Sequence, residues 1–236
     1  MKNVSLLISV ILISIFVSEA TAQKKVTTIR QVTDFNAIEI SSGIDLYITQ
    51  GSRVSIKIEA ADDIQKTIFT KVHNGTLEIY AESDNILNWS LWSKKMKAYV
   101  TVPTLTKLSA SGGSDVYSQG AWKVNELKMN ASGGSDIKFD FIGSKVDCVA
   151  SGGSDLILGG KVSILAVSAS GGSDIKSYEL HAIKVTATAT GGSDVQVNVS
   201  TELNASANGG SDIYYSGNPA KVSKNSSGGS DITKKD

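Results

Sequence analysis

The tetrad Gly-Gly-Ser-Asp recurs seven times in the C-terminal half of this chain. Successive copies begin 18 to 21 residues apart. Their first glycines are Gly112, Gly133, Gly152, Gly171, Gly191, Gly209 and Gly228. Self-similarity at such a short period is the signature of a repeat architecture, in which each unit stacks on the next one.

The residues around each tetrad alternate between apolar or small side chains and polar ones. Two positions before the first glycine stand Ala110, Ala131, Ala150, Ala169, Ala189, Ala207 and Ser226. Directly after the aspartate stand Val116, Ile137, Leu156, Ile175, Val195, Ile213 and Ile232. A period of two that includes β-branched residues predicts strands with one buried face and one exposed face.

These units predict an all-β fold, a right-handed parallel β-helix (solenoid) with repeats of about 19 residues. One repeat is too short to bury its own apolar face, so the copies must stack in parallel and share a core. The Gly-Gly pair marks a corner of each coil because glycine adopts positive φ angles without steric cost. The hand follows from the usual hand of parallel crossover connections.

The sequence before the repeats is less regular. Residues 42–45, with the sequence Ser-Gly-Ile-Asp, resemble a degenerate version of the same corner. Strand-like runs follow at residues 54–60, 76–81 and 98–102. No run with a helical period is present, so we expect strands here as well.

The domain organisation follows from these patterns. Residues 1–22 read as a signal peptide, and residues 23–236 as one β-helix domain. Within that domain, residues 23–105 hold the irregular strands and residues 106–236 hold the seven repeats. The length alone leaves open one large β domain or two small ones.

The first residues indicate export. A lysine near the start is followed by an apolar run over residues 6–17 and then by small residues, which is the order of a secretory signal peptide. We expect cleavage after Ala22 or after Ala20. Cys148 is the only cysteine, so the mature chain has no internal disulfide and no cysteine at its new N-terminus for lipid attachment. No later run approaches the roughly 20 apolar residues of a membrane span, and we expect an exported protein of the periplasm, the cell surface or the extracellular space.

Several segments together resemble a known family. They are residues 35–38 (Phe-Asn-Ala-Ile), residues 42–46, and residues 99–105 leading into the first tetrad at residues 110–115. In this respect the chain is similar to the putative auto-transporter adhesin, head GIN domain family of Gram-negative bacteria, over nearly all of its mature length. The resemblance implies a right-handed β-helix, an export route and an adhesin-like role, and it supplies no catalytic residues. Some relatives resemble lipoproteins, and the absence of a cysteine after the signal departs from that pattern.

The aspartates of the tetrads should form a column along one edge of the β-helix, with neighbours roughly 5 Å apart. At that distance adjacent carboxylates repel one another, so something must offset the repulsion. One interpretation is that each carboxylate accepts hydrogen bonds from the serine hydroxyl and backbone amides of the corners. The other is a calcium ladder, although only one corner per coil carries the motif. The column consists of Asp115, Asp136, Asp155, Asp174, Asp194, Asp212 and Asp231.

A second candidate site interrupts the strand pattern at residues 85–95. Trp89 and Trp92 lie three positions apart in this polar segment. They are predicted to form a stacking platform for a sugar ring or for an apolar side chain of a partner, or else to fold over the β-helix and pack. Trp122, inside the first full repeat, is predicted to pack in the core.

No pattern predicts catalysis or nucleic-acid binding. The two histidines, His73 and His181, stand alone in the sequence, and the two arginines, Arg30 and Arg53, lie outside the repeats. There is no metal-ligand spacing, so no cofactor is expected apart from the calcium considered above. The chain carries 23 Lys and Arg against 23 Asp and Glu, which is no basic surface for a nucleic acid.

The sequence therefore predicts a non-catalytic envelope protein, an adhesin-like module that presents repetitive polar faces to glycans or to cell-envelope proteins. One alternative is a carbohydrate-active enzyme of the β-helix type, which would need carboxylates and a basic residue gathered in one groove. Another is a structural envelope protein with no small ligand. An uncapped end or edge of the β-helix would also allow copies of the chain to associate.

Overall fold

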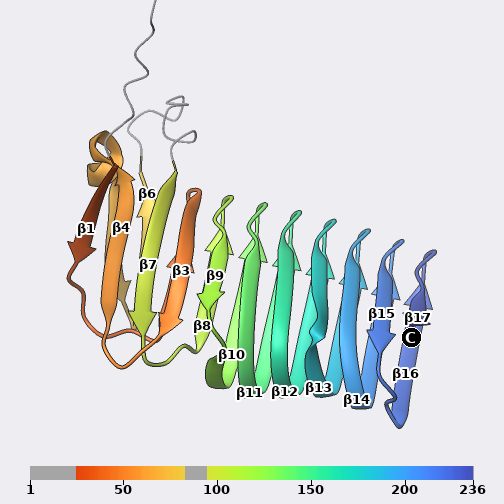
Figure 1. Ribbon diagram of the computed structural model, residues 1–236. Helices are drawn as coiled ribbons and strands as arrows, with labels where there is room; N and C mark the ends of the chain where they lie inside the picture. The colour runs from red at the N-terminus through yellow and green to blue at the C-terminus, as the bar shows by residue number, and fades with distance from the viewer. Residues whose placement is uncertain (1–24, 83–94, 236) are drawn as a thin grey trace, which may run out of the picture.

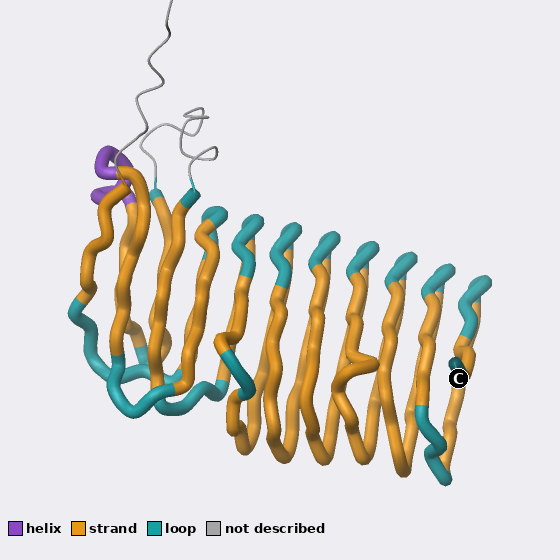
Figure 2. Tube along the Cα trace, in the orientation of Figure 1, coloured by secondary structure: helices purple, strands orange, loops and turns teal. Residues whose placement is uncertain are grey.

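The computed structural model describes residues 25–82 and 95–235 (Figures 1 and 2). The signal peptide predicted at residues 1–22 lies outside the described residues. The 17 strands of the described part are hydrogen-bonded into one continuous sheet that winds into a β-solenoid. The predicted all-β fold with a parallel β-helix of about 19 residues per coil is confirmed. In the described part, no helix is long and apolar enough to cross a membrane.

The regular coils occupy residues 107–235, a little more than the C-terminal half of the chain. Each coil has one strand that leads into a tetrad and one that leaves it, and the longer strands bend through a second corner without interruption (Figure 2). The strands are β8 (Lys107–Ser111), β9 (Val116–Gln119), β10 (Trp122–Ser132), β11 (Ile137–Ser151), β12 (Asp155–Ser170), β13 (Asp174–Thr190), β14 (Asp194–Asn208), β15 (Asp212–Ser216), β16 (Lys221–Ser227) and β17 (Ile232–Lys234).

Successive coils pair in parallel at the columns that the sequence predicts. Met129 pairs with Leu108 on one side and with Cys148 on the other, and Ile137 pairs with Val116 and Leu156. The solenoid has two sides. We call the side formed by the strand segments just before the tetrads the approach sheet, and the side formed by the segments just after them the departure sheet. The long strands β11 to β14 contribute to both, because each leaves one tetrad and leads into the next.

Apolar side chains of both sheets fill the space between them. The aliphatic column that follows each aspartate is buried up to Ile213, and the alanine column of the approach sheet lies beside it. Trp122, Phe139 and Phe141 are fully buried and pack with ring centroids 5.6 and 6.3 Å apart. The predicted packing role of Trp122 is therefore confirmed. Cys148 is buried as well, and burial raises the pKa of its thiol.

The Gly-Gly pairs form the corners, as predicted. Every glycine of the seven tetrads has a φ angle between 61° and 78°. Ser42 and Gly43 have φ angles of 68° and 70°, and Leu46 pairs in register with Val116. Residues 42–45 are thus an eighth corner, as the sequence predicts, with Ile44 in the place of the tetrad serine.

The N-terminal part contains β1 (Lys25–Arg30), β2 (Ala37–Ile40), β3 (Ile44–Gln50), β4 (Ser55–Ala61), the 3-10 helix η1 (Asp62–Thr67), β5 (Ile68–His73), β6 (Thr76–Ala81) and β7 (Met96–Val102). The strands β2 and β3 stack in parallel on the first regular coil. Beyond them the pairing changes: β1 is antiparallel to β4, β4 is antiparallel to β7, and β5 and β6 form a hairpin.

These antiparallel strands and η1 cover the N-terminal end of the stack (Figure 1). Ile64 of η1 and Ile68 of β5 are each 3% exposed and close the end of the core. At the other end β16 is exposed along its whole length. Its residues Lys224 and Ser226 stand in the columns that hold apolar side chains in earlier coils, so the last coil ends the core with polar groups.

Candidate functional site

The outer surface of the approach sheet carries two columns of short polar side chains, which we call the polar columns. Because the coils pair in register, equivalent residues of successive coils lie side by side. Every member is Ser, Thr or Asn except Val149, which is 43% exposed. The first column is Ser109, Asn130, Val149, Ser168, Thr188, Ser206 and Asn225, and the second is Ser111, Ser132, Ser151, Ser170, Thr190, Asn208 and Ser227.

The departure sheet has a different outer surface. Tyr47 stacks between Tyr99 and Tyr117, with ring centroids 5.2 and 5.3 Å apart. Stacked rings cover one another's faces, so this row is a packing element rather than an open platform. Burial and the nearby Asp115 carboxylate raise the pKa of Tyr117 to about 12. Farther along the row stand Lys138, Ile157, Lys176, Gln196 and Tyr214.

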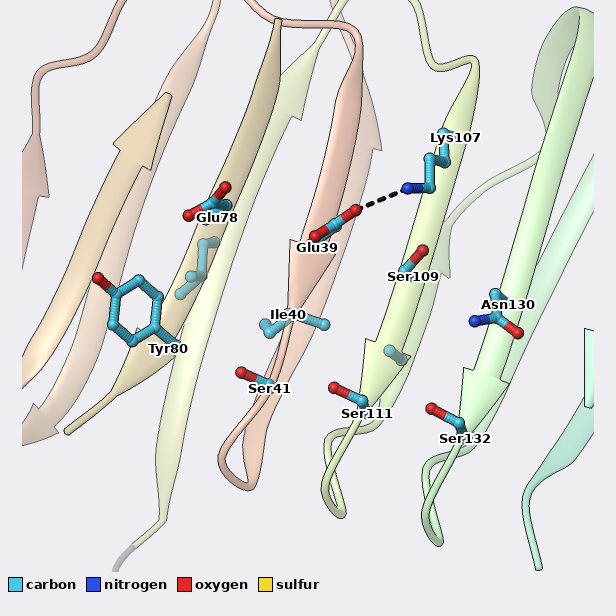
Figure 3. A pocket seen from close by; sticks show the side chains of 12 residues that line it. Glu39, Ile40, Ser41, Glu78, Tyr80, Lys107, Ser109, Ser111, Asn130 and Ser132 are labelled. Carbon is cyan, nitrogen blue, oxygen red and sulfur yellow. Dashed lines mark hydrogen bonds and ion pairs between the residues drawn. The ribbon is translucent and has the colours of Figure 1, made fainter. Parts of the chain in front are cut away.

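A groove with a volume of about 470 Å³ lies at the N-terminal end of the polar columns (Figure 3). It crosses β6, β2, β8 and β10 on the outer surface of the approach sheet. Its side chains are mostly polar, and they come from segments far apart in the sequence. The lining residues are Glu39, Ile40, Ser41, Glu78, Ile79, Tyr80, Lys107, Ser109, Ala110, Ser111, Asn130 and Ser132.

Pairing between strands places the charged residues of the groove. Glu39 of β2 is the register partner of both Glu78 of β6 and Ser109 of β8. The Lys107 Nζ atom lies 2.6 Å from a carboxylate oxygen of Glu39, and both side chains are nearly half exposed. Such a surface ion pair contributes little to stability.

Tyr80 stands at one wall of the groove (Figure 3). Its ring stacks on Phe69 of β5 with a centroid distance of 5.5 Å, and Lys71 Nζ donates a hydrogen bond of 2.7 Å to its hydroxyl. These contacts restrain the position of the ring.

The tetrad serines form a buried column at the corner, and each is at most 7% exposed. The Ser114 backbone N–H donates to Ser135 Oγ (3.0 Å), and the Ser135 N–H donates to Ser154 Oγ (3.1 Å). The same bond recurs along Ser154, Ser173, Ser193, Ser211 and Ser230. Each hydroxyl therefore accepts an amide of the preceding coil.

The tetrad aspartates form a second column beside the serines, with bonds in the opposite direction. The Asp136 N–H donates to Asp115 Oδ1 (3.1 Å), and the Asp155 N–H donates to Asp136 Oδ1 (3.0 Å). Asp174, Asp194 and Asp231 donate in the same way to the carboxylate of the coil before. The exception is the amide of Asp212, which donates to the Ser193 carbonyl at 3.2 Å.

The aspartate column carries the repulsion that its spacing predicts. Burial raises the pKa of Asp136 and of Asp194, and the carboxylates of the adjacent coils raise both pKa values further. Lys176 offsets part of this repulsion, because its Nζ lies 2.9 Å from Asp155 and 3.5 Å from Asp174. Residues 25–82 and 95–235 contain no group of three or more His, Cys, Asp or Glu arranged to hold a metal ion. The calcium interpretation stays a prediction.

The other candidates lie elsewhere. Trp89 and Trp92 fall outside the described residues, so the predicted platform stays a prediction. His73 contacts Asn74 at 2.9 Å, and His181 contacts Asn198 at 3.0 Å beside a shallow apolar groove at the second corner. Arg30 Nη2 donates to the Gln65 carbonyl at 3.1 Å. These contacts serve packing and local hydrogen bonding.

Sequence reasoning missed the groove and its residues Glu39, Glu78 and Tyr80. One signal was available. Asn74-Gly75 separates two alternating runs, which is typical of a two-residue hairpin, and both residues have positive φ angles. That hairpin pairs β6 with β5. The adjacency of β2 to β6 and β8 depends on pairings that no local pattern contains.

Comparison with known proteins bears on both the fold and the family. The sequence profile of the family described as "Putative auto-transporter adhesin, head GIN domain" matches residues 34–219. A putative adhesin from Bacteroides fragilis is 25% identical, with a TM-score of 0.83 over 90% of this chain and 98% of that chain. A putative lipid binding protein from Parabacteroides distasonis is 18% identical, with a TM-score of 0.72 over 91% of this chain and 98% of that one.

A putative adhesin from Parabacteroides merdae is 20% identical, with a TM-score of 0.69 over 91% of this chain and 98% of that chain. At this identity the two Parabacteroides structures show the same fold and no more. No curated protein matches the chain.

Proposed function

Because the chain belongs to the putative auto-transporter adhesin, head GIN domain family, we propose that it is an exported, non-catalytic binding module that holds a glycan chain along its approach sheet. The polar columns are the surface that it uses. The family name and the Bacteroides fragilis relative support an adhesin-like role, and the ligand class is our inference from the surface.

The observation that carries this proposal is the uniformity of the polar columns. Hydroxyl and amide side chains both donate and accept hydrogen bonds, as sugar hydroxyls do. They repeat at the strand spacing of about 4.8 Å, close to the length of one unit in an extended sugar chain. A polymer that lies along the solenoid axis therefore meets at least one hydroxyl or amide side chain in every coil.

Each of these contacts is weak. A neutral hydrogen bond exchanged with water contributes only about 0.5–1.5 kcal/mol. Several linked units bound at once have a far higher avidity than one unit alone. We therefore expect the polar columns to bind polymers tightly and any single sugar weakly.

The open groove also bears on the enzyme alternative, because Glu39, Glu78 and Lys107 are the kind of set that it requires. The Glu39 side chain is 45% exposed and paired with Lys107 on an open surface. Catalytic carboxylates act most strongly where the site excludes water. This exposure supports binding rather than hydrolysis.

The test is a binding assay of the mature chain on immobilised polysaccharides. Ser170→Arg places a long charged side chain in the middle of the polar columns, and the matched control Gln196→Arg places it on the departure sheet. We expect Ser170→Arg to weaken polymer binding by about tenfold or more, because several adjacent contacts are lost together, while Gln196→Arg leaves binding unchanged.

Equal effects of the two variants, or no binding of any polysaccharide by the wild-type chain, would contradict the proposal. Assaying the bound polymer for new reducing ends in the same experiment tests the enzyme alternative. The predicted association of copies through an end or edge stays a separate prediction, for which ultracentrifugation of the mature chain is the measurement.

A further inference from the structure

We propose that the groove lined by Glu39, Glu78, Tyr80 and Lys107 is a subsite for the terminal unit of the glycan, selective for amino and neutral sugars over acidic ones. The inference rests on the function proposed above and adds to it a defined end, where the chain is anchored. It also adds a charge preference that the polar columns do not have.

The shape of the groove follows from the heights of four neighbouring side chains. Tyr80 of β6, Ser41, which follows β2, Ser111 of β8 and Ser132 of β10 occupy equivalent places beside one another (Figure 3). A tall ring stands next to three short side chains, so the space above the serines is open. In later coils the same column holds short residues throughout, and the surface is level.

Its size suits a small ligand. Pockets for small molecules have volumes of roughly 300–1,000 Å³, and the groove has about 470 Å³. Unlike the level columns, it is bounded on one side by Tyr80. It is therefore the place on the approach sheet where a single sugar unit can be held without help from the rest of the chain.

The lining matches both kinds of surface that a sugar presents. Phe69 covers one face of the Tyr80 ring, and the rest of the ring offers an apolar wall to the C–H groups of a sugar; the contacts with Phe69 and Lys71 pre-organise it. Carboxylates are strong acceptors for sugar hydroxyls, and Asn130 both donates and accepts. The floor serines, Ser109 and Ser111, complete the set of polar partners.

The charges of the lining set the preference. Two carboxylates, Glu39 and Glu78, lie at the groove together with two lysines, and both lysines are already engaged: Lys107 pairs with Glu39, and Lys71, the register partner of Glu78, donates to the Tyr80 hydroxyl. A sugar ammonium group can pair with Glu78, whereas a sugar carboxylate would be repelled by both carboxylates and would have to displace a lysine from its present partner. Acidic sugars should therefore bind less well than neutral ones, and amino sugars should bind best.

The position of the groove gives the bound chain a direction. Asn130 and Ser132 line the groove and also belong to the polar columns. A glycan whose terminal unit occupies the groove continues without a break over the second and later coils. The end of the polymer is thus recognised at the N-terminal end of the solenoid.

The test is calorimetry of the mature chain with three trisaccharides: one of glucosamine, its N-acetylated form and one of galacturonic acid. We expect the glucosamine trisaccharide and its N-acetylated form each to bind at least about tenfold more tightly than the galacturonic acid trisaccharide. Glu78→Gln should remove most of the advantage of glucosamine over the N-acetylated form and should leave the thermal midpoint unchanged.

Tyr80→Ala should weaken both amino and neutral trisaccharides by about tenfold, and Tyr80→Phe, which keeps the ring and its stacking on Phe69, should restore binding. The departure-sheet variant Gln196→Arg is the matched control. It should leave the binding of all three trisaccharides unchanged, because Gln196 lies outside both the groove and the polar columns.

The inference is overturned if the acidic trisaccharide binds as tightly as the others, or if Glu78→Gln and Tyr80→Ala have no effect on the binding of the folded variants. If the polymer binds and no trisaccharide does, the groove assignment fails while the proposed function stands. If neither binds, both fail. Cleavage of a trisaccharide would replace the binding role by an enzymatic one.

Discussion

In residues 107–235 every strand between the ends pairs in parallel with its counterpart in the coil before and the coil after, whereas in residues 25–102 β1, β4 and β7 pair antiparallel and β5 and β6 form a hairpin. The corner at residues 42–45 belongs to both regions. It stacks on the first coil in register, but Ile44 stands where the coils have serine.

The difference shows what each region requires. A coil in the middle of the stack has identical neighbours on both sides, so a short repeated motif satisfies every backbone group. The N-terminal part has such a neighbour on one side only and must cover the end of the core. It does so with residues that occur once, such as Ile64 and Ile68. Five experiments test this contrast.

The largest effect is expected at the second corner of a regular coil. Gly160 has a φ angle of 108°, and a Cβ atom there would overlap the Phe141 carbonyl oxygen of the preceding coil. Gly160→Ala should therefore destabilise the protein by about 4 kcal/mol or more, measured by urea unfolding. Gly153→Ala is the control. It has open space around the added methyl group and should cost only about 1–2 kcal/mol for its positive φ angle. Equal losses would show that packing between coils does not decide the cost.

The next effect concerns the corner that the two regions share. The Ile44 side chain is fully buried, and its backbone N–H donates to Ser114 Oγ. Ile44→Ser restores the repeat motif but removes apolar volume from the N-terminal end of the core. We expect a loss of about 2–5 kcal/mol in the free energy of unfolding. A stabilising effect would mean that, at this end, the serine side chain of the repeat motif contributes more to stability than the buried apolar side chain of Ile44.

A smaller loss is expected inside the serine ladder. Ser154 Oγ accepts the Ser135 N–H, and the whole group is buried. Ser154→Ala leaves that amide without its partner and should cost about 1–3 kcal/mol in chemical denaturation. Ser151→Ala, on the outer surface of the same coil, should be neutral. A neutral Ser154→Ala would show that the tetrad serine is not what holds the coils together.

The aspartate column should give a small, pH-dependent effect of opposite sign. The pKa of Asp136 is raised in the folded protein, so its contribution to stability is greatest below the unfolded pKa and is lost as the pH rises through the folded pKa. Asp136→Asn keeps an oxygen that can accept the Asp155 N–H. At neutral pH it should stabilise by roughly 0.5 kcal/mol or less, after solvent screening. The gain should disappear below about pH 4, as followed by thermal unfolding.

No effect is expected from calcium. Most carboxylates of the column already accept a backbone amide, as Asp115 and Asp136 do. The thermal midpoint of the mature chain should therefore be the same in EDTA and in millimolar calcium. A rise of several degrees would indicate binding to the native state by mass action and would assign the column to a metal ladder.

The regular coils were predictable from sequence because their information is local and repeated. The tetrads predict the corners, and the alternation beside them predicts which side chains are buried, down to Trp122 and Cys148. Burial of the serines and the opposite directions of the two ladders were not predicted, because both are relations between coils rather than within one.

The N-terminal part was less predictable for the same reason. The strand-like runs at 54–60, 76–81 and 98–102 were identified, but their antiparallel partners and η1 depend on how the end of the core is covered. The candidate groove arises where Tyr80 of this irregular part meets the serines of the first coils. Only the three-dimensional pairing brings these residues together.

The reciprocal ladders have a consequence for how such proteins change in length. Each coil gives an amide to the serine of the next coil and another to the aspartate of the one before, with few exceptions. Excising or duplicating one whole repeat therefore leaves every remaining partner in place. The number of coils can therefore change without changes at either end of the solenoid. Gain or loss of repeats in the gene would lengthen or shorten the polar surface in steps of about 4.8 Å.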